Sequence, residues 1–416
     1  MRHDALVVSV IFFVLLFTAG QAIAFYEWND GSSSTDMRGF VRLTGAALRN
    51  PDNRIFYPNK TDTSAWGIAR LLFFGKVGER LSMELNAYNL VVNNSSKGAF
   101  AQDTTTTGAE RSAWLETKYL DETNNSGLAG IDRLNFTLSL GRVDVKLGRQ
   151  PVNFATAFYF TPNDFFAPFS AQTFFRTYKP GVDAARIEIR LGALTQLTFL
   201  GVLGYSANGS TSNGYSGQIS SNRSSSLARV STVIADFELT ALGGSVRDST
   251  ILGGSAQGEI FGGWLSIRAE GHHAKPDDAS KKSSDEFVVE VERRFNRKLT
   301  ASAIYFYHGA GKNSAAEYSE LLRDSGAQNL YLGKRYMAIG ASYEYSPLTT
   351  LQAVAIVNST DNSRLFSFYS VHSLTDETEL SVSLGMPQGA APGNMNIKSE
   401  YGAYPYFIGL ELRSYF

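Results

Sequence analysis

The chain has 416 residues, no cysteine, 38 glycines, 28 phenylalanines, 20 tyrosines and a formal net charge of −1 at pH 7. Without cysteine it can form no disulfide, thiolate metal site or covalent haem attachment, and its near-neutral charge offers nucleic acid no basic surface. A composition rich in glycine and aromatic residues, with polar and apolar residues interleaved, favours one large β domain over two α/β domains.

The N-terminus has the pattern of a secretory signal peptide. Arg2 and His3 precede an apolar run over residues 5–18, and the triplet Ala22-Ile23-Ala24 supplies small residues for a signal peptidase. The apolar run is too short, and wrongly flanked, for a lasting membrane span. We therefore expect residues 1–24 to be a cleaved signal peptide and residues 25–416 to form a single domain.

Beyond this region, apolar and polar side chains alternate with a period of two, which is the period of a β-strand. Leu81, Met83 and Leu85, for example, alternate with Ser82 and Glu84. Such alternation predicts a strand with one face for lipid and one for water.

Short turns and long polar stretches separate these segments, as in the two rims of a transmembrane barrel. Gly141-Arg142 reads as a two-residue hairpin turn, whereas residues 93–108 form a Ser, Asn and Thr tract without an apolar period. A helical turn is expected at 315–323. The predicted strands are residues 36–48, 61–76, 81–88, 113–119, 134–140, 143–147, 181–191, 195–205, 227–234, 237–246, 251–260, 264–272, 287–291, 299–307, 337–345, 351–357, 365–371, 380–384 and 404–416.

The strand count follows from chain length. At roughly 20 to 24 residues per strand, about 390 residues give roughly 16 to 20 strands, and bacterial single-chain barrels have even numbers. We therefore predict an all-β fold, a closed antiparallel transmembrane β-barrel of about 18 strands. The predicted set holds one strand more than this, and we place the miscount within residues 110–150, where long and short connections fail to alternate.

The last strand ends in an aromatic residue, Phe416, and the residues at every second position before it are mostly apolar. This resembles the C-terminal signal of bacterial outer-membrane barrels, which their assembly machinery reads. An edge strand of a soluble sandwich is the alternative. The residues that the resemblance assigns to the assembly signal are Phe416, Leu412, Leu410 and Ile408.

One stretch, residues 147–186, breaks the alternation. Its aromatic residues are too dense and irregular for a lipid-facing strand, and its prolines prevent a continuous ladder. We expect it to fold into the lumen as a constriction in which Arg176, Lys179 and Arg186 face Asp164 and Asp183. The alternative is a rim loop held by aromatic packing, with the same charges simply paired.

The sequence Gly148-Arg149-Gln150, the run Asn163-Asp164-Phe165-Phe166-Ala167-Pro168 and the run from Tyr178 to Arg186 resemble a block found in porin-like outer-membrane channels. Some of these channels sheathe multihaem cytochromes in the porin–cytochrome conduits of metal-reducing bacteria. The resemblance covers residues 147–186, with only generic barrel character elsewhere. The resemblance implies a channel, and the porin–cytochrome conduits are one subset of such channels.

A barrel of this size leaves an aqueous lumen. The expected role is therefore an outer-membrane porin-like channel of a Gram-negative bacterium, for passive diffusion of small polar solutes or ions. The alternative is a barrel sheath that houses multihaem c-type cytochromes in an electron-transfer conduit, which requires a wide and unobstructed lumen. The expected partners are outer-membrane lipids and the barrel assembly machinery. The sequence leaves open whether the protein forms a homo-oligomer.

Catalysis is not expected, and no cofactor or metal site is predicted. Four of the five histidines, His272, His273, His308 and His372, lie in the predicted barrel, and none is beside a recognisable nucleophile motif. His272 and His273 are adjacent, and adjacent strand residues point to opposite faces, which argues against one shared metal ion.

Overall fold

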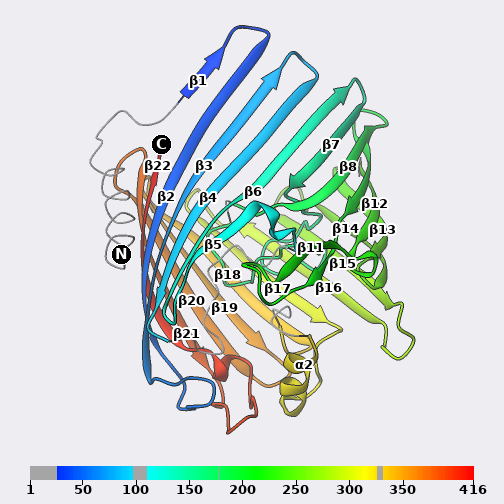
Figure 1. The fold of residues 1–416 in the computed structure, drawn as a ribbon. Coiled ribbons are helices and arrows are strands. Elements are labelled where there is room, and N and C mark those ends of the chain that lie inside the picture. Colours follow the sequence, from blue (N-terminus) through cyan, green and yellow to red (C-terminus); the bar gives the residue numbers. More distant parts are fainter. Residues whose placement is uncertain (1–25, 97–109, 177, 326–330) are drawn as a thin grey trace, which may run out of the picture.

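The computed structural model describes residues 26–96, 110–176, 178–325 and 331–416. They form a closed antiparallel β-barrel with 18 wall strands and almost no helix, which confirms the predicted fold (Figure 1). The predicted signal peptide lies outside the described residues. The wall strands are β2 (Ser33–Arg49), β3 (Thr61–Val77), β4 (Leu81–Asn94), β6 (Asn125–Leu140), β7 (Val143–Gln150), β8 (Val182–Arg190), β9 (Thr195–Val202), β12 (Ser225–Ile234), β13 (Phe237–Val246), β14 (Ser249–Ile260), β15 (Leu265–Pro276), β16 (Ser284–Arg294), β17 (Leu299–His308), β18 (Arg335–Ser346), β19 (Thr349–Asn358), β20 (Ser363–Ser373), β21 (Thr378–Gln388) and β22 (Tyr406–Tyr415).

Four short strands lie outside this wall. β1 (Tyr26–Asn29) pairs with the start of β2, and β10 (Tyr205–Ala207) pairs with β11 (Tyr215–Ile219). β5 (Glu116–Asp121) pairs with the first residues of β6, whereas β7 pairs with the rest of β6. The strand predicted at 113–119 is therefore a short rim strand and not a wall strand, which is the miscount expected within residues 110–150.

The barrel closes between its first and last wall strands. β2 and β22 pair along a ladder that runs from Phe40 opposite Tyr415 to Arg49 opposite Tyr406. The backbone N–H of Phe416 donates to the carbonyl of Gly39 at 2.9 Å, and Gly39 donates back at 2.6 Å. The final residue of the chain thus extends the closing ladder, while its predicted role as an assembly signal stays a prediction.

The two ends of the barrel differ in their connections. At one end, here called the turn end, strands join through tight hairpins, and Gly78 and Gly141 adopt φ values of +61° and +66° that favour glycine. The other end, here called the loop end, carries the long connections at 50–60, 95–124, 151–181, 203–224, 309–334 and 389–405.

The predicted helical turn at 315–323 is confirmed at the loop end. A 3₁₀ turn (Ala315–Glu317) leads into the short helix α2 (Tyr318–Ser325). Among the described residues, no helix is long and apolar enough to cross a membrane.

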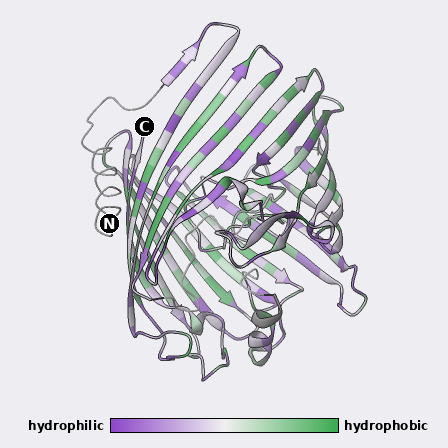
Figure 2. Cartoon of the chain, in the orientation of Figure 1, coloured by the Kyte–Doolittle hydropathy of each residue, from purple (hydrophilic) through white to green (hydrophobic). Residues whose placement is uncertain are grey.

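Hydrophobic and hydrophilic residues alternate along the wall strands (Figure 2), and the exposed fractions of their side chains assign them to two faces. Leu410 and Ile408 on β22 are 55% and 53% exposed on the outer face, whereas Arg413 on the same strand is 2% exposed inside the barrel. On the neighbouring side of the wall, Glu84 and Arg133 form an inward ion pair at 2.9 Å. Period two therefore separates an apolar outer face from a charged lumen.

Candidate functional site in the barrel lumen

The connection between β7 and β8, residues 151–181, lies inside the barrel and is here called the lumen segment (Figure 1). Prolines at 151, 162, 168 and 180 prevent it from continuing either strand. Its side chains and backbone meet inward-facing residues of strands on several sides of the wall. The contacts divide into two kinds, one for each half of the segment.

The first half is held by a carboxylate on β15. Glu270 is 3% exposed and accepts hydrogen bonds from the backbone N–H groups of Thr156, Ala157 and Asn163. The Asn163 side chain adds a bond to the carbonyl of Gly254 on β14 at 3.1 Å. A charged acceptor that receives several N–H donors makes strong, directional contacts.

A second carboxylate, Glu290 on β16, repeats this arrangement. It is fully buried and accepts from the backbone N–H groups of Phe158 at 3.1 Å and Tyr159 at 3.3 Å. Its other oxygen accepts from the guanidinium of Arg268 at 2.7 Å. The two glutamates therefore fix the path of residues 156–163 along the wall.

Aromatic packing covers the same half. Phe160 is fully buried and stacks on Phe306 of β17 with ring centroids 4.7 Å apart. Tyr331 and Tyr336 lie at 5.2 and 5.9 Å from the Phe160 ring. The phenylalanines that looked too dense for a strand thus form a small core inside the lumen.

Arginines hold the second half. The guanidinium carbon of Arg413 on β22 lies 3.7 Å from the ring centroid of Phe175, and that of Arg42 on β2 lies 5.0 Å from it. Both distances lie within the range of a cation–π contact.

Tyr178 makes cation–π contacts of the same kind with arginines of nearby strands. Its ring lies between Arg70 of β3 at 3.7 Å and Arg133 of β6 at 4.3 Å. Its hydroxyl donates to Asp132 at 2.6 Å. The rings of the lumen segment therefore rest on a row of wall arginines.

The structure brings two of the predicted constriction residues together. Lys179 forms an ion pair with Asp164, and the two side chains are 11% and 3% exposed. Burial raises the pKa of Asp164 and lowers the pKa of Lys179, and their mutual attraction opposes both shifts. The pair links the two halves of the lumen segment.

Arg176 lies elsewhere in the segment. Its guanidinium donates to the carbonyls of Thr173 at 2.7 Å, Ser170 at 3.1 Å and Ala171 at 3.2 Å, and it covers the Phe158 ring at 4.5 Å. Burial lowers the pKa of Arg176. Its contacts brace the fold of the segment itself.

The remaining two predicted residues lie on β8. Asp183 accepts from Arg149 at 2.7 Å, from the backbone of Ser112 at 2.9 Å and from Tyr205 at 2.9 Å. Arg186 pairs with Glu188 on its own strand. The pairing of Arg176, Lys179 and Arg186 against both aspartates is thus present only for Lys179 and Asp164.

A row of cations faces the lumen on four wall strands, of which β6, β7 and β8 are consecutive and β12 follows beyond β9. It comprises Arg133 on β6, Lys146 on β7, Arg186 on β8 and Arg229 on β12. Lys146 lies directly opposite Arg186 in the ladder, and in the described part of the chain it has no ion pair within 4 Å. Like charges directly opposite one another are unfavourable, and Glu188 beside Arg186 offsets part of this repulsion.

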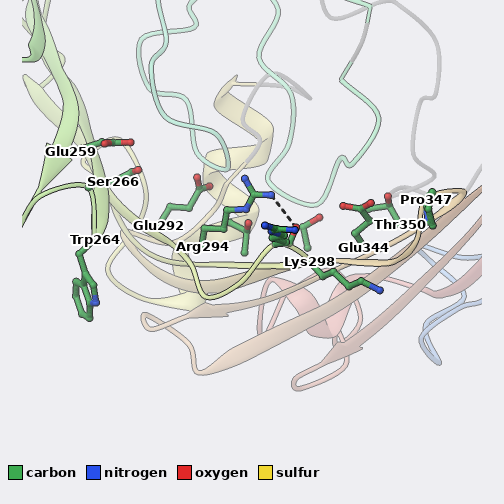
Figure 3. Close-up of a pocket in the computed structure, with 13 residues that line it drawn as sticks. Glu259, Trp264, Ser266, Glu292, Arg294, Lys298, Glu344, Pro347 and Thr350 are labelled. Carbon is green, nitrogen blue, oxygen red and sulfur yellow. Dashed lines mark hydrogen bonds between the residues drawn. The ribbon is translucent and has the colours of Figure 1, made fainter.

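The lumen widens into a hollow at the turn end, with a volume of about 580 Å³. Figure 3 shows Glu292 and Arg294 directed toward this hollow and Trp264 directed away from it. Arg294 donates to the carbonyl of Arg297 at 2.9 Å. Both acidic and basic side chains line this mouth, among them Glu259, Glu344 and Lys298.

The histidines have structural partners. His308 contacts Glu286 at 2.9 Å, His272 contacts Asn163 at 3.2 Å, and His273 contacts Asp285 at 2.7 Å. Across the described ranges, no three His, Cys, Asp or Glu side chains gather closely enough to hold a metal ion.

Sequence reasoning missed the wall residues that hold the segment: Glu270, Glu290, Arg42, Arg70 and Arg413. Each occupies a lumen-facing position of its strand, which the alternation does signal. Nothing in the alternation distinguishes an anchoring charge from a solvated one.

No protein-family model and no curated protein matches the sequence. Several solved structures are similar to the chain. OccAB3 of Acinetobacter baumannii has a TM-score of 0.58 and 10% identity, over 92% of this chain and 99% of that chain. OccAB4 of the same organism has a TM-score of 0.57 and 9% identity, over 93% and 100%. A BenF-like porin from Pseudomonas fluorescens Pf-5 has a TM-score of 0.56 and 10% identity, over 92% and 98%. The chain therefore shares the 18-stranded fold of bacterial outer-membrane porins.

Proposed function

We propose that this protein is an outer-membrane porin through which small polar solutes or ions diffuse passively. The observation that carries the proposal is the closed barrel with charged side chains on its inner wall and an anchored segment crossing its lumen. A wall of this strand number encloses an aqueous lumen. The anchored segment sets where that lumen is narrowest, and lumen charges bias which solutes enter.

An outer-membrane location also orients the barrel. In outer-membrane barrels the short turns face the periplasm and the longer loops face outward. The turn end is then periplasmic and the loop end faces the outside of a Gram-negative cell. Outer-membrane lipids surround the apolar face, and the barrel assembly machinery recognises the last strand.

The row of Arg133, Lys146, Arg186 and Arg229 supports a preference for anions. Several of these cations have acidic neighbours, so the net field is local. Lys146 contributes most, because it adds a positive charge without an ion pair of its own among the described residues. Charge in a narrow, water-filled lumen is poorly screened.

The alternative role as a cytochrome sheath requires a wide and unobstructed lumen. The lumen segment is anchored across the space that a haem chain would occupy. The geometry therefore favours the channel.

The test is a bilayer recording of purified protein with Lys146→Glu and, separately, Arg186→Glu. We expect the reversal potential in a salt gradient to shift toward cation selectivity, while Lys281→Glu, in an exposed connection at the loop end, leaves it unchanged. Selectivity that responds instead to Arg176→Glu with Lys179→Glu would place the selective site on the lumen segment. A wild-type barrel that conducts only after a bound cytochrome is removed would contradict the channel and support the conduit.

A further inference from the structure

The outer surface of the loop end carries a groove with a volume of about 320 Å³. It lies between the β2–β3 connection and the β21–β22 connection. We call it the rim groove and define it by Arg49, Asp52, Lys60, Gln388, Tyr404 and Tyr406.

Arg49 occupies the lipid-facing side of the wall. It lies directly opposite Tyr406 of β22 in the closing ladder, and Tyr406 is 49% exposed at the end of the apolar series formed with Ile408 and Leu410. Arg49 therefore follows the last apolar outward residues of its strand. An aromatic residue at this level is typical of the interface between acyl chains and headgroups.

The cations of this groove outnumber its acids. Arg49 and Lys60 are exposed, and neither has an ion pair within 4 Å in the described part of the chain. Asp52 is the single acid among the residues that define the groove. Two cations against one acid leave the groove positive.

The positive surface continues around the rim. Gln388, which lines the groove, lies directly opposite Arg364 of β20, and Arg335 begins β18 two strands further on. Arg364 and Arg335 are exposed on the same outward face, because the residues next to them, Leu365 and Tyr336, are buried inside the barrel. The row of cations thus lies along the level where headgroups meet the barrel.

We propose that the rim groove binds a phosphorylated glycolipid of the outer leaflet, with lipid A phosphate on Arg49 and Lys60. The assignment rests on charge complementarity, because cations at a lipid-facing rim attract anionic headgroups. Lipid A carries two phosphates on a sugar, so one molecule reaches more of the row than a phospholipid headgroup does. The inference rests on the outward orientation of the loop end and not on conduction.

The test is native mass spectrometry of the full-length protein in detergent. The variants are Arg49→Gln with Lys60→Gln, the charge-conserving pair Arg49→Lys with Lys60→Arg, and Arg293→Gln. Arg293 is the matched control, because it is an outward arginine at the opposite end of the barrel, where it covers Trp264 at 3.9 Å. The probes are bisphosphorylated lipid A, dephosphorylated lipid A and phosphatidylglycerol.

We expect the glutamine pair to weaken binding of bisphosphorylated lipid A by roughly tenfold or more. The charge-conserving pair and Arg293→Gln should bind as the wild type does, and dephosphorylated lipid A should not bind. Three results would each overturn the proposal. They are unchanged binding of bisphosphorylated lipid A by the glutamine pair, an equal loss of that binding in Arg293→Gln, and binding of phosphatidylglycerol as tight as that of lipid A. Conductance of the glutamine pair, measured in parallel, should equal that of the wild type, so a failed channel and a failed lipid site give different results.

Discussion

The two halves of the lumen segment are attached to the wall by opposite chemistries. Residues 156–163 offer backbone N–H donors to two buried carboxylates, Glu270 and Glu290. Phe175 and Tyr178 offer aromatic rings to wall arginines, as Phe175 does with Arg413. In the first half the wall accepts from the backbone. In the second half wall cations bind the rings, and Arg133 also donates to the backbone carbonyl of Lys179.

The difference teaches how each half depends on sequence. A carboxylate that accepts from the backbone holds any residue except proline, because every other residue has an N–H group. The cation–π contacts of the arginine row require aromatic side chains, although Arg133 also donates to the backbone carbonyl of Lys179. The carboxylate contacts are also directional and desolvated, so losing one leaves several donors without a partner. The stacked contacts are weaker and more tolerant of small displacements.

The largest expected effect comes from replacing both carboxylates, in Glu270→Ala with Glu290→Ala. Each backbone donor left unpaired costs about 1–3 kcal/mol, so we expect the first half of the segment to leave the wall and reach water. Single-channel conductance should then rise, with more noise in the open state, while the barrel still inserts.

The control for this variant is Glu292→Ala, two residues along β16 and also inward, whose side chain is 31% exposed and contacts Arg268. It should leave conductance near the wild-type value. Equal conductance in the double variant and the control would show that the carboxylates do not hold the segment.

A second effect tests the link between the halves. Lys179→Met removes one partner of the buried pair with Asp164, and a buried charge left unpaired costs about 3–5 kcal/mol. We expect lower thermal stability of the folded barrel and a shifted conductance. Adding Asp164→Leu should recover most of the loss, because it removes the orphaned carboxylate. If the double variant is no more stable than Lys179→Met alone, the two halves are not joined by this pair.

The smallest effect is expected in the aromatic half. Phe175→Leu and Tyr178→Leu each remove cation–π contacts worth about 0.5–2 kcal/mol. Conductance should change less than in the carboxylate variants. Tyr178→Phe keeps the ring over Arg70 and should lie closer to the wild type, unless the hydroxyl contact to Asp132 dominates. A larger change in Tyr178→Phe than in Phe175→Leu would assign the second half to hydrogen bonding.

The fold could be predicted from the sequence because strand alternation is local. Every wall strand corresponds to a predicted strand, since lipid on one side and water on the other impose a period of two. The prediction of a wall strand at 113–119 was wrong, because a short rim strand such as β5 has the same local pattern as a wall strand. What separates them is pairing on both edges, which depends on distant residues.

The candidate site was predictable only in outline. The prolines and dense aromatic residues of 151–181 indicated a segment that leaves the wall. Its anchors could not be predicted, because Glu270 lies more than 100 residues away from Thr156 and resembles any other polar lumen residue. The charges chosen from the segment itself were found in local contacts, as with Arg176 and the carbonyl of Thr173. Which wall residues face the segment depends on how the strands are aligned with one another, and the sequence of a single strand does not contain that register.

The closing ladder has a kinetic consequence. Thr44 of β2 donates to Glu411 of β22 at 3.0 Å across a separation of 367 residues. Pairings between such distant residues form slowly, whereas the hairpins of the turn end need only local contacts. The contact between Phe175 and Arg413 of β22 needs the last strand in place as well. Full anchoring of the lumen segment is therefore one of the late, long-range steps of folding, together with closure of the wall.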